Sequence, residues 1–306
     1  MLNLLGKRYV FFGISLLIII PGLILAAIGL PLAIDFTGGS LLEVRFESGK
    51  APQPASVIEL YNELGVEDVT VQTTGEDILI ARSSFLDDNT RGLIVSAMEQ
   101  KFSDKVTMRR FESVGPTIGQ EVTQRASLAI AVAAVIVILY VTYAFRGIPH
   151  AFRYGICAII AMVHDVAIVF SLGAIGGRLF GWQIDALFLT ALLTVIGFSV
   201  QDKIVVFDRI RENSTIYRKL PFETLVNHSI IQTLQRSINT QLMTVEFMLL
   251  ALALFGGVTL REFAIILLVG LFSGTYSSIF IAAPILVVWE NREWQRWFKR
   301  GNAAVA

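Results

Sequence analysis

Long apolar runs separated by short polar segments dominate the chain. A helix needs roughly 20 mostly apolar residues to cross the hydrocarbon core of a bilayer. Six runs reach that length: 10–30, 126–145, 154–175, 186–207, 238–257 and 263–288. The first run is longer than the roughly 7–15 apolar residues of a cleaved signal peptide, so we expect it to remain as an anchor. The pattern predicts an α-helical membrane protein with six transmembrane helices.

The polar segment between the first two runs changes its periodicity several times. Alternating apolar and polar positions predict strands, and spacing of three and four residues predicts helices. The expected strands are Leu41–Phe46, Asp68–Gln72, Asp77–Ala81 and Val106–Phe111, and the expected helices are Pro54–Leu64 and Thr90–Phe102. The order βαββαβ is typical of a ferredoxin-like α+β domain. We therefore divide the chain into residues 1–30, a folded domain at 31–125, a membrane region at 126–290 and a tail at 291–306.

Basic residues near the ends of the spans predict the orientation, because cytoplasmic loops carry an excess of Lys and Arg. An N-terminus inside the cell leaves only Arg178 and Arg261 on the short outer loops. It assigns the other span-flanking bases to the cytoplasm: Lys7, Arg8, Arg146, Arg153, Lys203, Arg209, Arg211, Arg218, Lys219, Arg236, Arg292, Arg296, Lys299 and Arg300. Both termini are then cytoplasmic, and the domain at 31–125 is extracytoplasmic.

Composition excludes most other classes of protein. Charged residues make up 16% of the 306 positions, whereas a soluble domain carries about 25%. The formal net charge is zero, which gives no reason to expect nucleic-acid binding. Three histidines and one cysteine argue against a metal site. No phosphate-binding loop of the G-x-x-x-x-G-K type occurs, so we expect no cofactor and no NTP-driven enzyme activity.

Three acidic residues lie inside predicted spans, where a charged side chain costs about 2.5–3.5 kcal/mol on insertion scales. They are Asp165, Asp202 and Glu246. One interpretation is that each carboxyl is kept neutral or is paired with a facing hydroxyl. For Asp202, whose neighbour is Lys203, a hydrated helix end is a further alternative. Against that, apolar residues continue beyond Asp202, and Ser199 lies one turn earlier on the same face. Poorly solvated carboxyls of this kind favour reversible proton uptake.

Other polar and small residues are candidates for supporting roles. Arg236 begins the fifth span, where it is either the gating cation of a carboxylate or an interfacial anchor. Gly270, Gly274 and Ser278 recur every four residues, which is typical of close helix packing. The pair Gly38 and Gly39 favours either a hinge or a tight turn, since glycine adopts unusual backbone angles.

Several of these residues fall within strings that resemble one family. The strings are Asp35–Gly39, Val114–Pro116, His164–Val166, Gly197–Asn213 and Gly274–Phe280. They are similar to the DFTGG box, the VGP element, the HDV triplet and the fourth- and sixth-span motifs of the SecF family of protein-export membrane proteins. The resemblance extends from about residue 3 to residue 300, and the fourth- and sixth-span strings are its most specific part.

The resemblance implies more than the spacing does. Members of the family pair with SecD in a twelve-span unit of the resistance-nodulation-division type in the bacterial cytoplasmic membrane. They are non-enzymatic, and they use the proton-motive force to promote preprotein translocation through a SecYEG-type translocon. The family's proton-path aspartate falls on Asp202, its functional arginine on Arg236 and its third-span aspartate on Asp165.

Two positions depart from the family's pattern. Where the family usually reads Asn-Asp-Thr, this chain has Gln201-Asp202-Lys203, and a lysine beside the acid would favour its ionised form. Glu246 stands at a position that is usually apolar, so its membership of the relay is open. We expect protonation of Asp202 to release it from Arg236 and to shift the fourth span, with Gly38 and Gly39 passing the movement to the outer domain.

Other functions remain open from sequence alone. A proton-coupled lipid or drug exporter of the same superfamily usually holds two six-span halves in one chain, whereas this chain has one. A passive assembly scaffold of the translocon would need none of the intramembrane acids. An intramembrane hydrolase would require Ser199 and His164 to act as nucleophile and base, although neither lies in a hydrolase motif.

Overall fold

The structure is a computed structural model that describes residues 3–146, 151–241, 247–256, 258–293 and 295. The chain divides into two units, each described by itself. A sheet unit contains residues 31–129 and 183–186, and a helical unit contains the rest. The expected domain, 31–125, ends four residues before the first segment of the sheet unit does.

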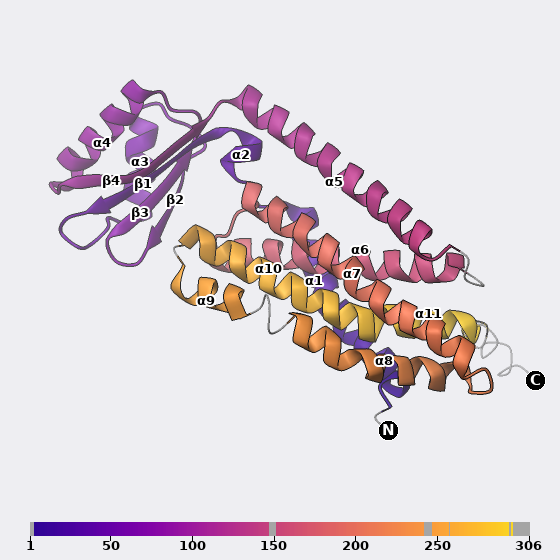
Figure 1. Ribbon diagram of the computed structural model, residues 1–306. Coiled ribbons are helices and arrows are strands. Elements are labelled where there is room, and N and C mark those ends of the chain that lie inside the picture. Colours follow the sequence, from indigo (N-terminus) through magenta and orange to yellow (C-terminus); the bar gives the residue numbers. More distant parts are fainter. Residues whose placement is uncertain (1–2, 147–150, 242–246, 257, 294, 296–306) are drawn as a thin grey trace, which may run out of the picture. The chain divides into compact units, whose positions relative to one another are not determined.

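The sheet unit contains six elements in the order β1 (Gly39–Phe46), α3 (Pro54–Glu63), β2 (Thr70–Thr74), β3 (Ile78–Ser83), α4 (Asp88–Phe102) and β4 (Val106–Val114). The strands are antiparallel and lie in the order β2-β3-β1-β4. Figure 1 shows both helices on one face of this sheet. The βαββαβ order and the approximate bounds follow the alternation read from the sequence.

The core of the sheet unit forms because alternate residues of β1 point to the same face. Leu42, Val44 and Phe46 are buried there against Tyr61 of α3 and Met98 of α4, among others. The intervening positions of β1 are half-buried or exposed. Burial therefore fixes the register of β1, because a slip of one residue would turn its apolar side chains away from the helices.

The two adjacent glycines stand at the start of β1, after the short helix α2 (Ile34–Thr37). Gly38 has φ of 73° and Gly39 has φ of 122°, both in the region that favours glycine. A Cβ on Gly39 would lie 2.6 Å from the carbonyl oxygen of Ser83 on β3, and one on Gly38 would lie 2.9 Å from Cα of Pro116. The pair thus permits close backbone approach within the sheet unit as well as unusual backbone angles.

Gly39→Ala is expected to destabilise the sheet unit by about 1–3 kcal/mol through backbone strain, with the clash against Ser83 adding to the loss. Gly49→Ala is the matched control, because Gly49 also has a positive φ of 77° but nothing within 4 Å of the added Cβ. Hydrogen exchange of the β1 and β3 amides in the full chain measures both losses. Equal losses in the two variants would show that the Ser83 contact imposes no constraint.

The helical unit and the segments that lead into it contain long helices and several short ones. Their bounds are η1 (Leu5–Lys7), α1 (Arg8–Ile28), α5 (Pro116–Ala144), α6 (Ala151–Phe180), α7 (Ala186–Ile216), α8 (Phe222–Ile238), α9 (Phe247–Phe255), α10 (Val258–Ser277), η3 (Ser278–Ala282) and α11 (Ala283–Glu290). Within the described residues, five helices are long and apolar enough to cross a membrane: Leu5–Ile28, Pro116–Ala144, Ala151–Phe180, Ala186–Ile216 and Leu260–Glu290. The protein is therefore a helical membrane protein.

Some of these helices extend well beyond the apolar runs from which the spans were predicted. The second span was expected at 126–145, yet α5 begins at Pro116, and the fourth was expected to end at residue 207, yet α7 continues to Ile216. The backbone hydrogen bonds of a helix do not require apolar side chains, so each helix extends into a polar segment. The expected fifth span, 238–257, includes residues 242–246 and 257, which lie outside the described part of the chain, and Glu246 is among them.

The last span contains a π-helical turn, η3, that ends two residues before Pro284. Proline lacks a backbone N–H and its ring crowds the carbonyl four residues earlier, so the regular hydrogen-bond ladder cannot continue through it. The helix widens to a π-turn over Ser278–Ala282 and then resumes. Single π-turns in α-helices are frequent at functional sites.

Candidate functional site

Small residues bring α6, α7 and α10 close together in the helical unit. A Cβ on Gly270 of α10 would lie 2.3 Å from Cγ2 of Val195 on α7 and 3.1 Å from Cγ2 of Val169 on α6. One turn later, a Cβ on Gly274 would lie 3.3 Å from Cα of Ser199. At this separation, short serine side chains reach across from one helix to the next.

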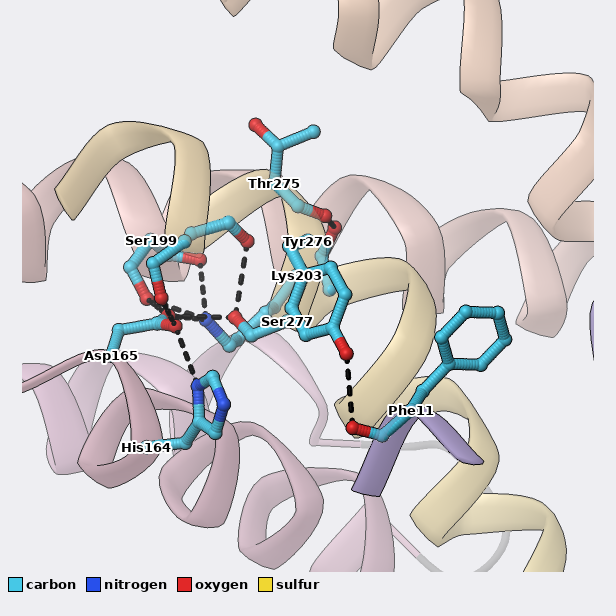
Figure 2. A network of polar contacts seen from close by, with 11 residues as sticks. Phe11, His164, Asp165, Ser199, Lys203, Thr275, Tyr276 and Ser277 are labelled. Carbon is cyan, nitrogen blue, oxygen red and sulfur yellow. Dashed lines mark hydrogen bonds and ion pairs between the residues drawn. The ribbon is translucent and has the colours of Figure 1, made fainter. Parts of the chain in front are cut away.

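Asp165 on α6 is the centre of the polar network that these helices enclose (Figure 2). Its Oδ2 accepts hydrogen bonds from Oγ of Ser199 at 2.6 Å and Oγ of Ser277 at 2.7 Å. Its Oδ1 accepts one from Oγ of Ser273 at 2.8 Å and lies 3.0 Å from Nδ1 of His164. The side chain is 1% exposed, so protein groups alone solvate this carboxylate.

Lys203 on α7 supplies the charge that balances Asp165. Its Nζ lies 2.7 Å from Oδ2 of Asp165 and also donates to the hydroxyl and the carbonyl of Ser199. The Lys203 side chain is 0% exposed. From sequence we expected this lysine to act on its neighbour Asp202, but the structure pairs it with Asp165 instead. A buried pair of this kind is costly to break, because removing one partner leaves an uncompensated charge.

Asp202 directly precedes Lys203 on α7 but has a separate set of partners. Its Oδ1 accepts a hydrogen bond from Oγ of Ser237 on α8 at 2.9 Å, and its Oδ2 accepts one from Oγ of Ser278 on η3 at 2.8 Å. The residue is 8% exposed. Among the described residues, the ion pairs of the structure include none to Asp202.

Arg236 is exposed at the end of α8, and the structure records no ion pair between it and Asp202 in the described part of the chain. The next residue, Ser237, holds Asp202 instead. The expected direct contact between Asp202 and Arg236 is therefore not present in this conformation. Ser278, which we expected only as a packing residue, is the second donor to Asp202.

A second polar chain leads from Asp165 toward α1. The ring of His164 stacks on that of Tyr276, with centroids 6.2 Å apart and planes inclined by 23°. The hydroxyl of Tyr276 donates to the carbonyl oxygen of Phe11 on α1 at 3.0 Å, as Figure 2 shows. The buried Nε2 of His164 has no hydrogen-bond partner among the described residues. The acid network and the first span are thus joined through α10.

The arrangement does not resemble a hydrolytic site. A serine nucleophile needs a base within hydrogen-bond reach, but Ser199 and His164 each contact Asp165 rather than each other. Among the residues that the structure describes, no group of three or more His, Cys, Asp or Glu side chains could hold a metal ion. The network is built from hydroxyls, two carboxylates, one ammonium group and the imidazole of His164.

Sequence reasoning missed Ser237, Ser273 and Ser277 as donors, and it related Lys203 to Asp202 rather than to Asp165. A signal for the serines was present, since Ser273 and Ser277 lie four residues apart and therefore on one face of a helix. Hydroxyls on that face opposite an intramembrane acid are natural hydrogen-bond donors. Nothing in the sequence indicates which acid the Lys203 side chain faces, because residues 202 and 203 differ by only about 100° around the helix axis.

Comparisons with known proteins place the chain in a family. The family described as protein export membrane protein SecD/SecF, C-terminal, matches residues 94–292, and the SecD/SecF GG motif matches residues 23–50. A protein translocase subunit SecF from Anaerolinea thermophila is 71% identical over 302 residues, which are 98% of this chain and 98% of that protein. The chain belongs to the SecF family of protein translocase subunits. It is therefore a component of protein transport.

Two further comparisons extend this assignment. A protein translocase subunit SecF from Thermobaculum terrenum is 46% identical, covering 100% of this chain and 99% of that protein. The crystal structure of the translocon-associated membrane protein SecDF from Thermus thermophilus matches with a TM-score of 0.81 at 33% identity. That match covers 95% of this chain but 39% of the SecDF chain. The chain thus corresponds to about two fifths of a longer relative.

Proposed function

We propose that this protein pairs with a SecD subunit and uses the proton-motive force to promote preprotein translocation through a SecYEG-type translocon. Two observations support the pairing. The relative is named SecDF, which combines the names SecD and SecF, and this chain matches only about two fifths of its length. In this proposal the chain has six spans in a bacterial cytoplasmic membrane, with both termini in the cytoplasm and the sheet unit outside. Unfolded preproteins are the substrate on the outer side.

The observation that carries the proton coupling is the difference between the two buried acids. Asp165 accepts hydrogen bonds from several donors. One of them is an ammonium group, which can donate but never accept a hydrogen bond. These partners match an ionised carboxylate. Asp202 is held by two hydroxyls only, and a hydroxyl both donates and accepts.

The hydroxyls around Asp202 therefore suit both of its protonation states. When Asp202 is ionised, Ser237 and Ser278 donate to it; when it is protonated, one hydroxyl rotates and accepts the new proton's hydrogen bond. No heavy atom has to move for the proton to be taken up. We assign Asp202 as the proton acceptor and Asp165 as a fixed charge that organises the same helices.

The change of charge on Asp202 is coupled in this proposal to movement of α7 against α8 and η3, the elements that hold it. Arg236, exposed next to Ser237, is placed to attract the ionised acid from the cytoplasmic side. The contact of Tyr276 with Phe11 passes the movement to α1, and Gly38 and Gly39 act as the hinge beyond it. One charge crossing 100 mV supplies about 2.3 kcal/mol, more than the 1.4 kcal/mol of a tenfold bias.

Export in inverted membrane vesicles tests this function. We expect completion of preprotein translocation to slow more than tenfold when a protonophore dissipates the gradient, provided that the translocation ATPase is kept saturated with ATP. Vesicles that lack this subunit should lose that sensitivity. If the subunit accelerates export equally with and without a gradient, it is a passive scaffold and the proposed coupling is wrong.

A further inference from the structure

The surroundings of the Lys203 ammonium are those of a bound cation. Its Nζ contacts three oxygen atoms: Oδ2 of Asp165 at 2.7 Å, the carbonyl oxygen of Ser199 at 3.2 Å and the Ser199 hydroxyl. Carboxylate, hydroxyl and carbonyl oxygens are also the ligands of hard metal cations. Two further hydroxyls, of Ser273 and Ser277, lie on the same carboxylate.

The charges at this position already sum to zero. Asp165 carries one negative charge, and Lys203 carries one positive charge 2.7 Å away in a place where both side chains are at most 1% exposed. The other group on the carboxylate that titrates is His164 of α6; α7 and α10 present Lys203 and hydroxyls. A second cation would therefore meet a neutralised carboxylate and the repulsion of the ammonium group.

The surroundings of Asp202 differ from those of Asp165 both in charge and in hydrogen-bond partners. No ammonium or guanidinium group pairs with its carboxylate among the described residues. Gln241 stands one turn after Ser237 and Thr275 one turn before Ser278, and Oε1 of Gln241 and Oγ1 of Thr275 are buried with no hydrogen-bond partner in the described part of the chain. These two oxygen atoms remain available for hydrogen bonds on the helix faces that hold Asp202.

We propose that Lys203 is a tethered counter-ion that fills a monovalent-cation site formed by Asp165 and Ser199, and so keeps sodium out of that site. Lys203 is then a specificity-determining residue for the coupling ion, and it leaves Asp202 as the acid open to the proton. The exclusion of sodium from Asp165 is a property of the site itself. Only its consequence for coupling rests on the proposed function.

Lys203→Met tests the proposal in the full-length purified protein. Methionine removes the charge and keeps most of the length, so the Asp165 site should accept sodium in place of the ammonium group. At a roughly tenfold excess of sodium over its Kd, we expect the unfolding midpoint of this variant to rise by about 3–6 °C relative to N-methyl-D-glucamine at equal ionic strength. The parent protein should show no sodium-specific shift.

Two control variants isolate the site. Lys203→Met combined with Asp165→Asn removes the carboxylate, so its sodium-specific shift should disappear. Lys219→Met deletes an exposed lysine and should respond to sodium as the parent does. Lys203→Thr serves as a second variant with the same expected gain, in case the methionine does not pack.

The proposal is overturned if Lys203→Met and Lys203→Thr melt at the same temperature in both salts, or if neither folds at any sodium concentration. A sodium-specific shift of the parent protein would overturn it as well. A finding that export does not depend on the proton gradient would contradict only the proposed function. The sodium response of the Lys203 variants would remain valid evidence for the cation site.

Discussion

Asp202→Asn is expected to abolish the acceleration of export by the proton gradient while leaving the fold and the assembly with SecD intact. The amide has almost the same shape as the carboxyl, and its oxygen and nitrogen can bond the hydroxyls of Ser237 and Ser278 that hold Asp202. What the variant lacks is a group that takes up and releases a proton. The asparagine therefore mimics Asp202 held permanently in its protonated, neutral form.

The measurement compares export rates in inverted vesicles with and without a gradient. The variant should run at the rate that the parent protein shows after a protonophore is added, a decrease of more than tenfold if one charge crosses about 100 mV. Asp208→Asn is the matched control, because Asp208 lies on the same helix but is exposed and paired with Arg211. If Asp202→Asn keeps the full response to the gradient, Asp202 is not the proton acceptor.

Breaking the pair between Asp165 and Lys203 is expected to have the largest effect on stability. In sodium-free buffer, Asp165→Asn or Lys203→Met alone should lower the free energy of unfolding by about 3–5 kcal/mol, because each leaves one buried charge without its partner. The double variant should lose clearly less than the sum of the two, since no charge then remains. The two side chains are in contact at 2.7 Å, so their effects cannot be additive.

Unfolding in detergent, followed by the fluorescence of the tryptophans, gives the four midpoints of this double-mutant cycle. The exposed pair of Asp208 and Arg211, also 2.7 Å apart, provides the comparison and should show a coupling of only about 0–1 kcal/mol. Additive losses at Asp165 and Lys203 would mean that the pair is hydrated and that its burial has been misjudged.

The sheet unit was accessible to sequence reasoning because its local patterns agree with its tertiary contacts. Strand β1 alternates apolar and polar residues, and α3 has one apolar face, so period and burial indicate the same elements. The two short strands were displaced by one or two residues. The polar threonines and the glutamine of β2 carry little information about which of its residues pairs with which residue of β3.

The polar network was accessible only in part. The cost of an acid within lipid identifies Asp165 and Asp202 as unusual without any structure. The sequence could not say which of them Lys203 neutralises, because that depends on how α7 is rotated against α6 and α10. It also could not show that Ser237 rather than Arg236 reaches Asp202 in this conformation, since both residues directly precede the same predicted span.

The two hydroxyls that serve the two acids come from adjacent residues, Ser277 and Ser278, at the point where α10 gives way to the π-turn. Consecutive residues of a helix point about 100° apart, so one backbone segment is clamped between both carboxylates. Rotating that segment about its axis would move both hydroxyls at once, so one hydrogen bond of each acid is coupled to the other through the backbone. Ser277 and Ser278 therefore respond together to any rotation of this segment, and the π-turn before Pro284 is the place where the helix can rotate.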